Sequence, residues 1–343
     1  MSQETAGEVA ARIDAAASLA ELRSGAQQID ALIESLHRQG SGVELIAGCV
    51  GDLNARLFAR AWSLIAPAGL VANSCLIVMG SEGRGEQILK TDQDNALLLR
   101  DGFPTHGVAP VTARFSAALI GFGYPRCPGN IMLSNPLWCQ PLGAFRQTLR
   151  GWMFDGEPDG AMNLAIFIDA AAVAGDADLL RRARAFVDEF LVDNDVFFAR
   201  FASAADQFAE TDGWWAWLTH LRDHDEPAFD LKKLGTFPVV HGVRSLALEH
   251  HVAELGTAAR LQALVLRGHL PVAMAGELTE ALHVLMTLKL DNNLRQRRAA
   301  QAIDNVVQLS ALGAHERDLL KHAQAVIKRF RQYLRLHYRL DSL

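Results

Sequence analysis

Two short apolar runs in an otherwise helical pattern limit the fold most strongly. Residues 74–79 (SCLIVM) end at Gly80, and residues 96–99 (ALLL) follow after a polar, glycine-rich connection. Apolar runs of this length between turn residues are typical of buried strands, because a helix needs a longer segment. The sequence therefore predicts a small α/β unit built around two neighbouring strands.

Helical periodicity surrounds this unit. One helix is predicted from apolar residues at i, i+3, i+4 and i+7, with an end at residues 40–42 (GSG). Its apolar positions are Ile29, Leu32, Ile33 and Leu36. A second helix is predicted over 43–65, before Pro67, and a helical pattern runs again from Met162 to the last residue. Residues 131–133 are predicted as a short strand.

Charge and cysteine content argue against several classes of protein. The formal net charge of -6 disfavours a dedicated nucleic-acid binder, which needs a basic face. None of the cysteines forms the Cys-x-x-Cys pair that zinc sites use, so reduced, buried or half-buried thiols are predicted. They are Cys49, Cys75, Cys127 and Cys139. The N-terminal residues are polar, and no apolar run reaches the roughly 18 residues of a membrane span, which predicts a cytoplasmic protein.

Two aspartates stand two residues apart just before the second apolar run. If Asp92 and Asp94 lie on a strand, their side chains point to the same face. Two carboxylates that close repel each other unless a cation lies between them. Oxygen ligands suit Mg²⁺, which commonly takes one or two protein carboxylates and completes its shell with water and phosphate. The spacing therefore predicts a site for one or two magnesium ions.

The first apolar run ends in features that suit phosphate binding. Gly80 lacks a Cβ, so its backbone can approach a phosphate, and a short helix opening at Ser81 would offer N–H groups to an anion. Arg84 adds a guanidinium for phosphate oxygens. Each motif alone is common in ordinary loops. A phosphate cradle beside an acidic pair, however, is what phosphoryl or nucleotidyl transfer requires.

The same residues resemble a known family. Residues 80–87 (GSEGRGEQ) with 91–96 (TDQDNA) are similar to the signature of nucleotidyltransferases often fused to CBS or cyclic-nucleotide-binding modules. These resemble the uridylyltransferase that modifies the PII nitrogen-regulatory protein and belong to the DNA polymerase beta superfamily. Residues 123–136 resemble the family's segment after the catalytic strands, and residues 231–248 resemble its C-terminal domain. The resemblance covers most of the chain, in which neither fusion module is visible.

The resemblance implies an α+β fold with three segments. N-terminal helices would occupy 1–68, a small mixed-sheet nucleotidyltransferase core 69–150, and a large helical, substrate-binding-like domain 151–343. The implied reaction moves a nucleoside monophosphate, for example UMP, from a nucleoside triphosphate to a hydroxyl of a protein or small molecule. An acceptor protein would make this a signal-transduction enzyme. Neither a membrane nor a nucleic acid is an expected partner.

The resemblance also assigns roles to individual residues. Asp92 and Asp94 would bind Mg²⁺ and act in catalysis. The phosphate-binding residues would be Gly80, Ser81 and Arg84. Glu86 and Gln87 match the motif but receive no role.

One feature departs from the family pattern. The superfamily usually supplies a third carboxylate from a later strand, yet no Asp or Glu occurs between Asp101 and Asp155. Asp169 is the nearest candidate for this catalytic group, in a stretch that also fits a packed helix. Without a third carboxylate, the alternative is a catalytically inactive nucleotide-sensing regulatory protein.

Two further clusters fit ordinary packing. His250 and His251 are neighbours in a helical pattern and would point in different directions, so they are not expected to share a metal ion. Trp214, Trp215 and Trp217 are predicted to pack in a helical core.

Overall fold

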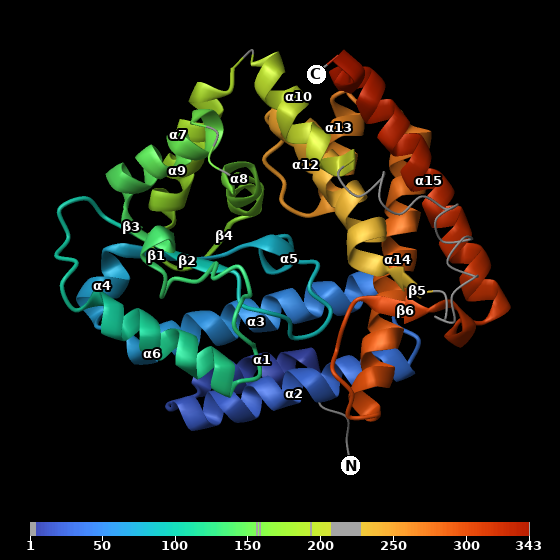
Figure 1. The fold of residues 1–343 in the computed structure, drawn as a ribbon. Coiled ribbons are helices and arrows are strands. Elements are labelled where there is room, and N and C mark those ends of the chain that lie inside the picture. Colours follow the sequence, from blue (N-terminus) through green and yellow to red (C-terminus); the bar gives the residue numbers. More distant parts are fainter. Residues whose placement is uncertain (1–4, 156, 158, 193, 207–227, 343) are drawn as a thin grey trace. The chain divides into compact units, whose positions relative to one another are not determined.

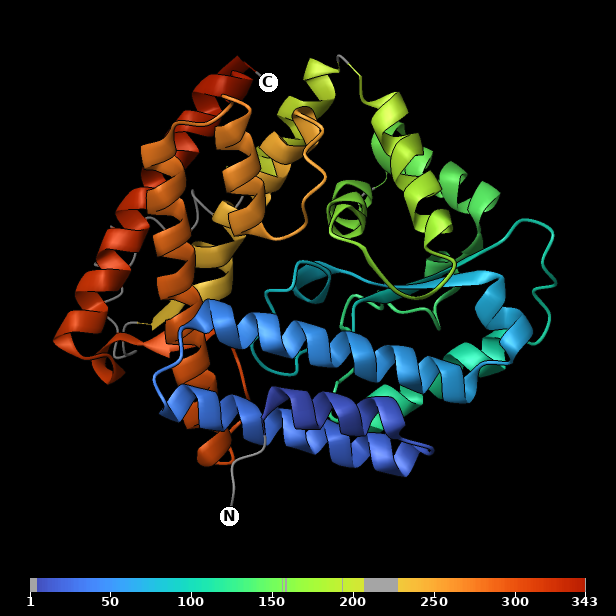
Figure 2. The ribbon, with the colours of Figure 1, turned by 180° about the vertical axis from the view of Figure 1, so that it is seen from behind.

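The computed structural model describes residues 5–155, 157, 159–192, 194–206 and 228–342. The chain forms two compact units, Met1–Val192 and Asp193–Leu343 (Figures 1 and 2). The tryptophans at 214, 215 and 217 lie outside the described residues. The mostly helical α+β class with a small mixed sheet is confirmed, whereas the predicted boundaries at 68/69 and 150/151 stay a prediction.

The first unit alternates helices with four short strands. Its elements are α1 (Ala6–Ala15), α2 (Leu19–Arg38), α3 (Val43–Ile65), α4 (Ala68–Ala72), β1 (Ser74–Val78), α5 (Gly80–Gly83), β2 (Asn95–Leu99), α6 (Val108–Gly121), a 3₁₀ turn (Pro136–Trp138), β3 (Cys139–Pro141), α7 (Leu142–Phe154), α8 (Gly160–Ile168), β4 (Ala171–Gly175) and α9 (Ala177–Phe190). The two strands and the helix predicted over 43–65 are confirmed, and the helix predicted before residue 40 lies within α2.

The sheet has the order β3-β2-β1-β4 and mixed directions. β1 pairs antiparallel with β2 on one side and with β4 on the other, and β2 pairs parallel with β3. Every residue of β1 and β2 is buried, because helices cover both faces. α3 and α6 lie on one face and α7 and α9 on the other, while α1 and α2 pack against α3 (Figures 1 and 2).

Two sequence-based expectations for this unit are wrong. Residues 131–133 form no strand, because the N–H of Leu133 bonds the side chain of Asn95 instead of a neighbouring strand. The continuous helical pattern expected after Met162 is interrupted by β4, whose alanine-rich sequence favours a helix in isolation. Pairing with β1 overrides that local preference, as tertiary context often does.

The second unit is a helical bundle with a two-stranded ribbon. Its elements are α10 (Asp195–Ser203), a 3₁₀ turn (Ala204–Asp206), β5 (Ala228–Asp230), a π-helical turn η4 (Leu231–Thr236), α12 (Phe237–Glu249), α13 (Thr257–Leu266), α14 (Val272–Arg298), β6 (Val306–Gln308), a 3₁₀ turn (Leu309–Ala311), α15 (Ala314–Tyr338) and a last 3₁₀ turn (Leu340–Ser342). α12, α14 and α15 pack together, and β5 pairs antiparallel with β6. The helical C-terminal domain is thus confirmed.

Two general expectations can be compared with the described residues. Among the helices that the structure describes, none combines the length and apolar character needed to cross a membrane. All four cysteines are free; Cys75 and Cys127 are buried and Cys49 and Cys139 are half-buried, as predicted.

Candidate active site

The end of β1 and the start of β2 lie side by side, at the same end of these two central strands. In their antiparallel register Val78 pairs with Asn95, and the N–H of Met79 donates to the carbonyl of Asp94 at 2.8 Å. The chain then turns into α5 directly at Gly80. The pairing of β1 with β2 therefore brings the glycine-serine motif at residues 80–81 next to the aspartates at 92 and 94.

Alternation along residues 92–95 separates the acidic side chains from the anchoring ones. Gln93 and Asn95 are buried and bond backbone groups of residues 116–133. Gln93 Nε2 donates to two carbonyls at 3.2 and 3.0 Å, and Asn95 Oδ1 accepts from an N–H at 3.0 Å. Asp92 and Asp94 both remain partly exposed. They lie just before β2 and not within it, but successive side chains still take opposite sides.

The two aspartates lie close together beside a cysteine. Ligand atoms of Asp92, Asp94 and Cys127 all lie within 4.8 Å of one another. Burial raises the pKa of Cys127 to about 12, and the negative charge of Asp94 adds to that shift, so the thiol is protonated at neutral pH. Two carboxylates and one neutral thiol therefore form this group.

Gly80 lies directly against the acidic pair. Its φ of 57° falls in the left-handed region, and a Cβ at this position would lie 2.8 Å from Oδ2 of Asp94. Only glycine combines that backbone conformation with this close approach. Ser81 follows in α5 and is partly exposed. The contact between Gly80 and Asp94 joins the two motifs physically.

Arg84 and Asp169 form a buried ion pair behind α5. Arg84 Nη1 donates to Asp169 Oδ2 at 2.6 Å, and its Nε donates to Glu86 Oε2 at 2.6 Å. The Arg84 side chain is 11% exposed and that of Asp169 is fully buried, at the end of α8 just before β4. The predicted roles of these two residues, phosphate binding and catalysis, are not tested by this arrangement. The arrangement does show that Arg84 and Asp169 are ion-pair partners.

A series of hydrogen bonds, which the sequence did not reveal, runs from α3 to the site. Tyr124 Oη donates to Asn54 Oδ1 at 2.5 Å, and Asn54 Nδ2 donates to Glu82 Oε2 at 3.2 Å. Burial raises the pKa of Glu82 to about 8; the hydrogen bond from Asn54 opposes this shift, and the nearby Asp94 adds to it. Glu82 is therefore a third acidic group of the site, largely protonated at neutral pH.

The raised pKa of Glu82 makes a testable prediction about stability. Between the usual value of 4.5 and about 8, the folded chain holds a proton that the unfolded chain has lost. The free energy of unfolding should therefore fall as pH rises through this window. We expect Glu82→Gln to flatten that slope in urea titrations at several pH values. The matched change Glu44→Gln, at an exposed position of α3, should keep the wild-type slope; equal slopes in all three proteins would contradict the assignment.

The donor set fits a hard divalent cation. The sulfur of Cys127 is a soft ligand and a poor match for such an ion, which prefers oxygen. The oxygens of Asp92 and Asp94 remain, and a pair of carboxylates suits Mg²⁺. These two residues would hold the ion.

Two family models match the chain. Residues 27–159 match the family described as "Putative nucleotidyltransferase DUF294", and residues 195–338 match the one described as "Putative nucleotidyltransferase substrate binding domain". No curated protein matches the chain. The matches define the class, a nucleotidyltransferase domain followed by a separate substrate-binding domain. Within this class, residues 27–159 belong to the DUF294 family of putative nucleotidyltransferases and residues 195–338 to its substrate-binding domain, which confirms the class indicated by residues 80–87 and 91–96.

Proposed function

We propose that the first unit transfers a nucleoside monophosphate from a nucleoside triphosphate to an acceptor hydroxyl. The observation that carries this proposal is the contact of Gly80 with Asp94, where β1 ends and β2 begins. Asp92 lies next to Asp94 there. In the reaction, the acceptor oxygen bonds the α-phosphorus and the bond to the β-phosphate breaks. Pyrophosphate leaves with that electron pair, and the hydroxyl proton passes to a base.

Each site residue has a proposed task in this reaction. Asp92 and Asp94 would hold Mg²⁺, which, when bound, offsets the negative charge of the reacting phosphates. Gly80 and Ser81 would hold the phosphates through their backbone and hydroxyl groups. A direct phosphate contact by Arg84 would require one of its two ion pairs to open.

The nature of the nucleotide and the acceptor comes from the resemblance to PII-modifying uridylyltransferases. We propose UTP as the first nucleotide to test, with a protein hydroxyl as acceptor and a small molecule as the next choice. The domain over residues 195–338 would supply the acceptor contacts, in keeping with the description of its family as substrate binding.

The proposal predicts a labelled product that depends on the acidic pair. The full chain is incubated with Mg²⁺, a cell lysate and each nucleoside triphosphate labelled at the α-phosphate. We expect label on one acceptor with one preferred nucleotide, and no label when Mg²⁺ is chelated. A nucleotide labelled at the γ-phosphate should leave the acceptor unlabelled. Transfer of γ-label, or transfer that survives chelation, would contradict the reaction class.

One observation favours a second candidate function. Asp169 is fully buried and bonded to Arg84, so it would have to leave this ion pair to orient an acceptor hydroxyl. A chain that binds the nucleotide without transferring it would be a nucleotide-sensing regulatory protein. Calorimetric binding of a nucleoside triphosphate with Mg²⁺, but no labelled product with any acceptor, would favour this alternative.

A further inference from the structure

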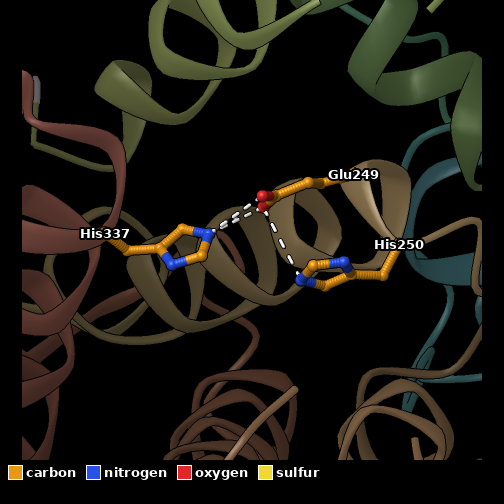
Figure 3. Close-up of side chains that lie close together, drawn as sticks. All are labelled: Glu249, His250 and His337. Atoms are coloured by element: carbon orange, nitrogen blue, oxygen red, sulfur yellow. Dashed lines mark hydrogen bonds and ion pairs between the residues drawn. The ribbon is translucent and has the colours of Figure 1, made fainter. Parts of the chain in front are cut away.

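Two histidines and one glutamate lie close together in the second unit, where α12 and α15 end (Figure 3). Glu249 is the last residue of α12, His250 follows it, and His337 lies in the last turn of α15. Nε2 of His337 is 2.9 Å from Oε2 of Glu249, and Nε2 of His250 is 3.9 Å from the same oxygen. One ligand atom from each residue lies within 4.8 Å of the other two.

We propose that Glu249, His250 and His337 bind a transition-metal dication of the zinc class, with a fourth position open to water or a ligand. Zinc bonds of about 2.0–2.2 Å place tetrahedral ligand atoms roughly 3.3–3.6 Å apart. The separations of 2.9 and 3.9 Å lie on either side of this range, and all three pairs lie within 4.8 Å. Metal binding would therefore require side-chain movement, and metal bonds would replace the hydrogen bond between His337 and Glu249. Two imidazoles and one carboxylate suit zinc, whereas magnesium prefers oxygen ligands alone.

The backbone around the cluster also favours a cation. α12 ends at Glu249 and α15 at Tyr338, so the carbonyl ends of two helices meet at this position. The partial negative charge at a helix C-terminus attracts cations. Arg267 donates to the carbonyls of His250 and His251 at 3.0 and 3.1 Å. It fixes the turn that carries the first imidazole and already offsets part of the negative end of α12.

Neighbouring side chains hold the ligands in place. Tyr338 Oη donates to Oε2 of Glu249 at 2.7 Å, and the ring of His269 stacks on His250 with centroids 3.7 Å apart. Such outer partners orient metal ligands in known sites.

The two histidines that are adjacent in sequence do not both belong to the cluster. His251 takes a left-handed backbone conformation, with a φ of 51°, at the turn after α12. The partner of His250 is His337, almost ninety residues further along the chain. For this reason the sequence indicated no metal site here.

Zinc titration of the metal-free full chain tests this proposal. The chain is treated with a chelator, dialysed and titrated with Zn²⁺ by calorimetry. We expect one tightly bound ion per chain. Replacing Zn²⁺ by Co²⁺ should give the intense visible bands of a tetrahedral site. None of the three ligands belongs to the candidate active site, so a loss of Zn²⁺ binding in variants of these ligands does not depend on the transferase proposal.

Single variants separate this site from general histidine binding. We expect His250→Gln and His337→Gln to weaken Zn²⁺ binding by about 100-fold or more, and Tyr338→Phe by about 10-fold, the scale for an outer partner. His322→Gln, at an exposed position of α15, should bind like the wild type. Circular dichroism and the metal-free melting temperature check that each variant folds. A wild type that binds no Zn²⁺, or ligand variants that bind it as tightly as His322→Gln, would overturn the proposal.

Discussion

Replacing Asp94 by asparagine is expected to lower nucleotidyl transfer by about 10³-fold or more. Asp94 is both a member of the acidic pair and the residue against which Gly80 packs. The change removes one negative ligand where a cation must offset the charge of the phosphates, an effect of several kcal/mol. A loss of about 4 kcal/mol in transition-state stabilisation corresponds to this change in rate.

The folded state should survive this substitution. Asparagine has the same shape, and the repulsion between the two carboxylates is relieved, so the metal-free melting temperature should stay equal or rise. Asp101→Asn provides the matched control, because it makes the same change beyond the opposite end of β2. Initial rates of label transfer and calorimetric Mg²⁺ titrations measure the effect. If the Asp94 variant transfers within a few-fold of the Asp101 variant, Asp94 is not a metal ligand.

Asp169→Asn should destabilise the first unit by about 3–5 kcal/mol. Its carboxylate is fully buried and bonds Arg84 at 2.6 Å, and removal of one member of a buried ion pair leaves the other charge poorly compensated. Gly83 packs so close to the carbonyl of Asp169 that any Cβ there would overlap it, so the surroundings cannot relax easily. The same variant would lower transfer by about 10²-fold if Asp169 is a general base.

A double-mutant cycle separates the ion pair from other effects. The variants are Asp169→Asn, Arg84→Met and their combination. The free energy of unfolding of each is measured by urea titration, and hydrogen exchange in peptides of β1 and β2 reports on the first unit. We expect the double variant to be more stable than the sum of the single changes predicts, with a coupling of about 0.5–3 kcal/mol. Asp178→Asn, in an exposed ion pair with Arg181, should change stability by less than about 1 kcal/mol. Additive effects of Asp169 and Arg84 would contradict the pair.

The sequence predicted the two strands and the turn between them because local rules determine these elements. A short apolar run, a glycine that ends it and two acids spaced by two residues specify strand, turn and face without knowledge of distant residues. The link from Tyr124 through Asn54 to Glu82 joins three separate segments, so no local pattern announces it. The cluster at His250 and His337 depends on the packing of α12 against α15 and was invisible for the same reason.

The failures at β4 and at residues 131–133 have a common physical cause. Alanine-rich β4 is a strand only because β1 offers it an unpaired edge. Residues 131–133 are apolar, yet Asn95 takes the backbone N–H that a strand partner would have needed. In both places a partner from elsewhere in the chain decides the backbone conformation.

The alternation of acidic and anchoring side chains at residues 92–95 also constrains how this chain can change in evolution. An inserted or deleted residue between Asp92 and β2 would reverse the sides of the residues before it, while Asn95 stays in register with Val78. Asp92 and Asp94 would then no longer lie on the same side. Substitutions that keep the spacing leave the two sides distinct. The number of residues between Asp92 and β2 is therefore fixed by this site, whereas residues 102–107, which are mostly exposed, carry no such constraint.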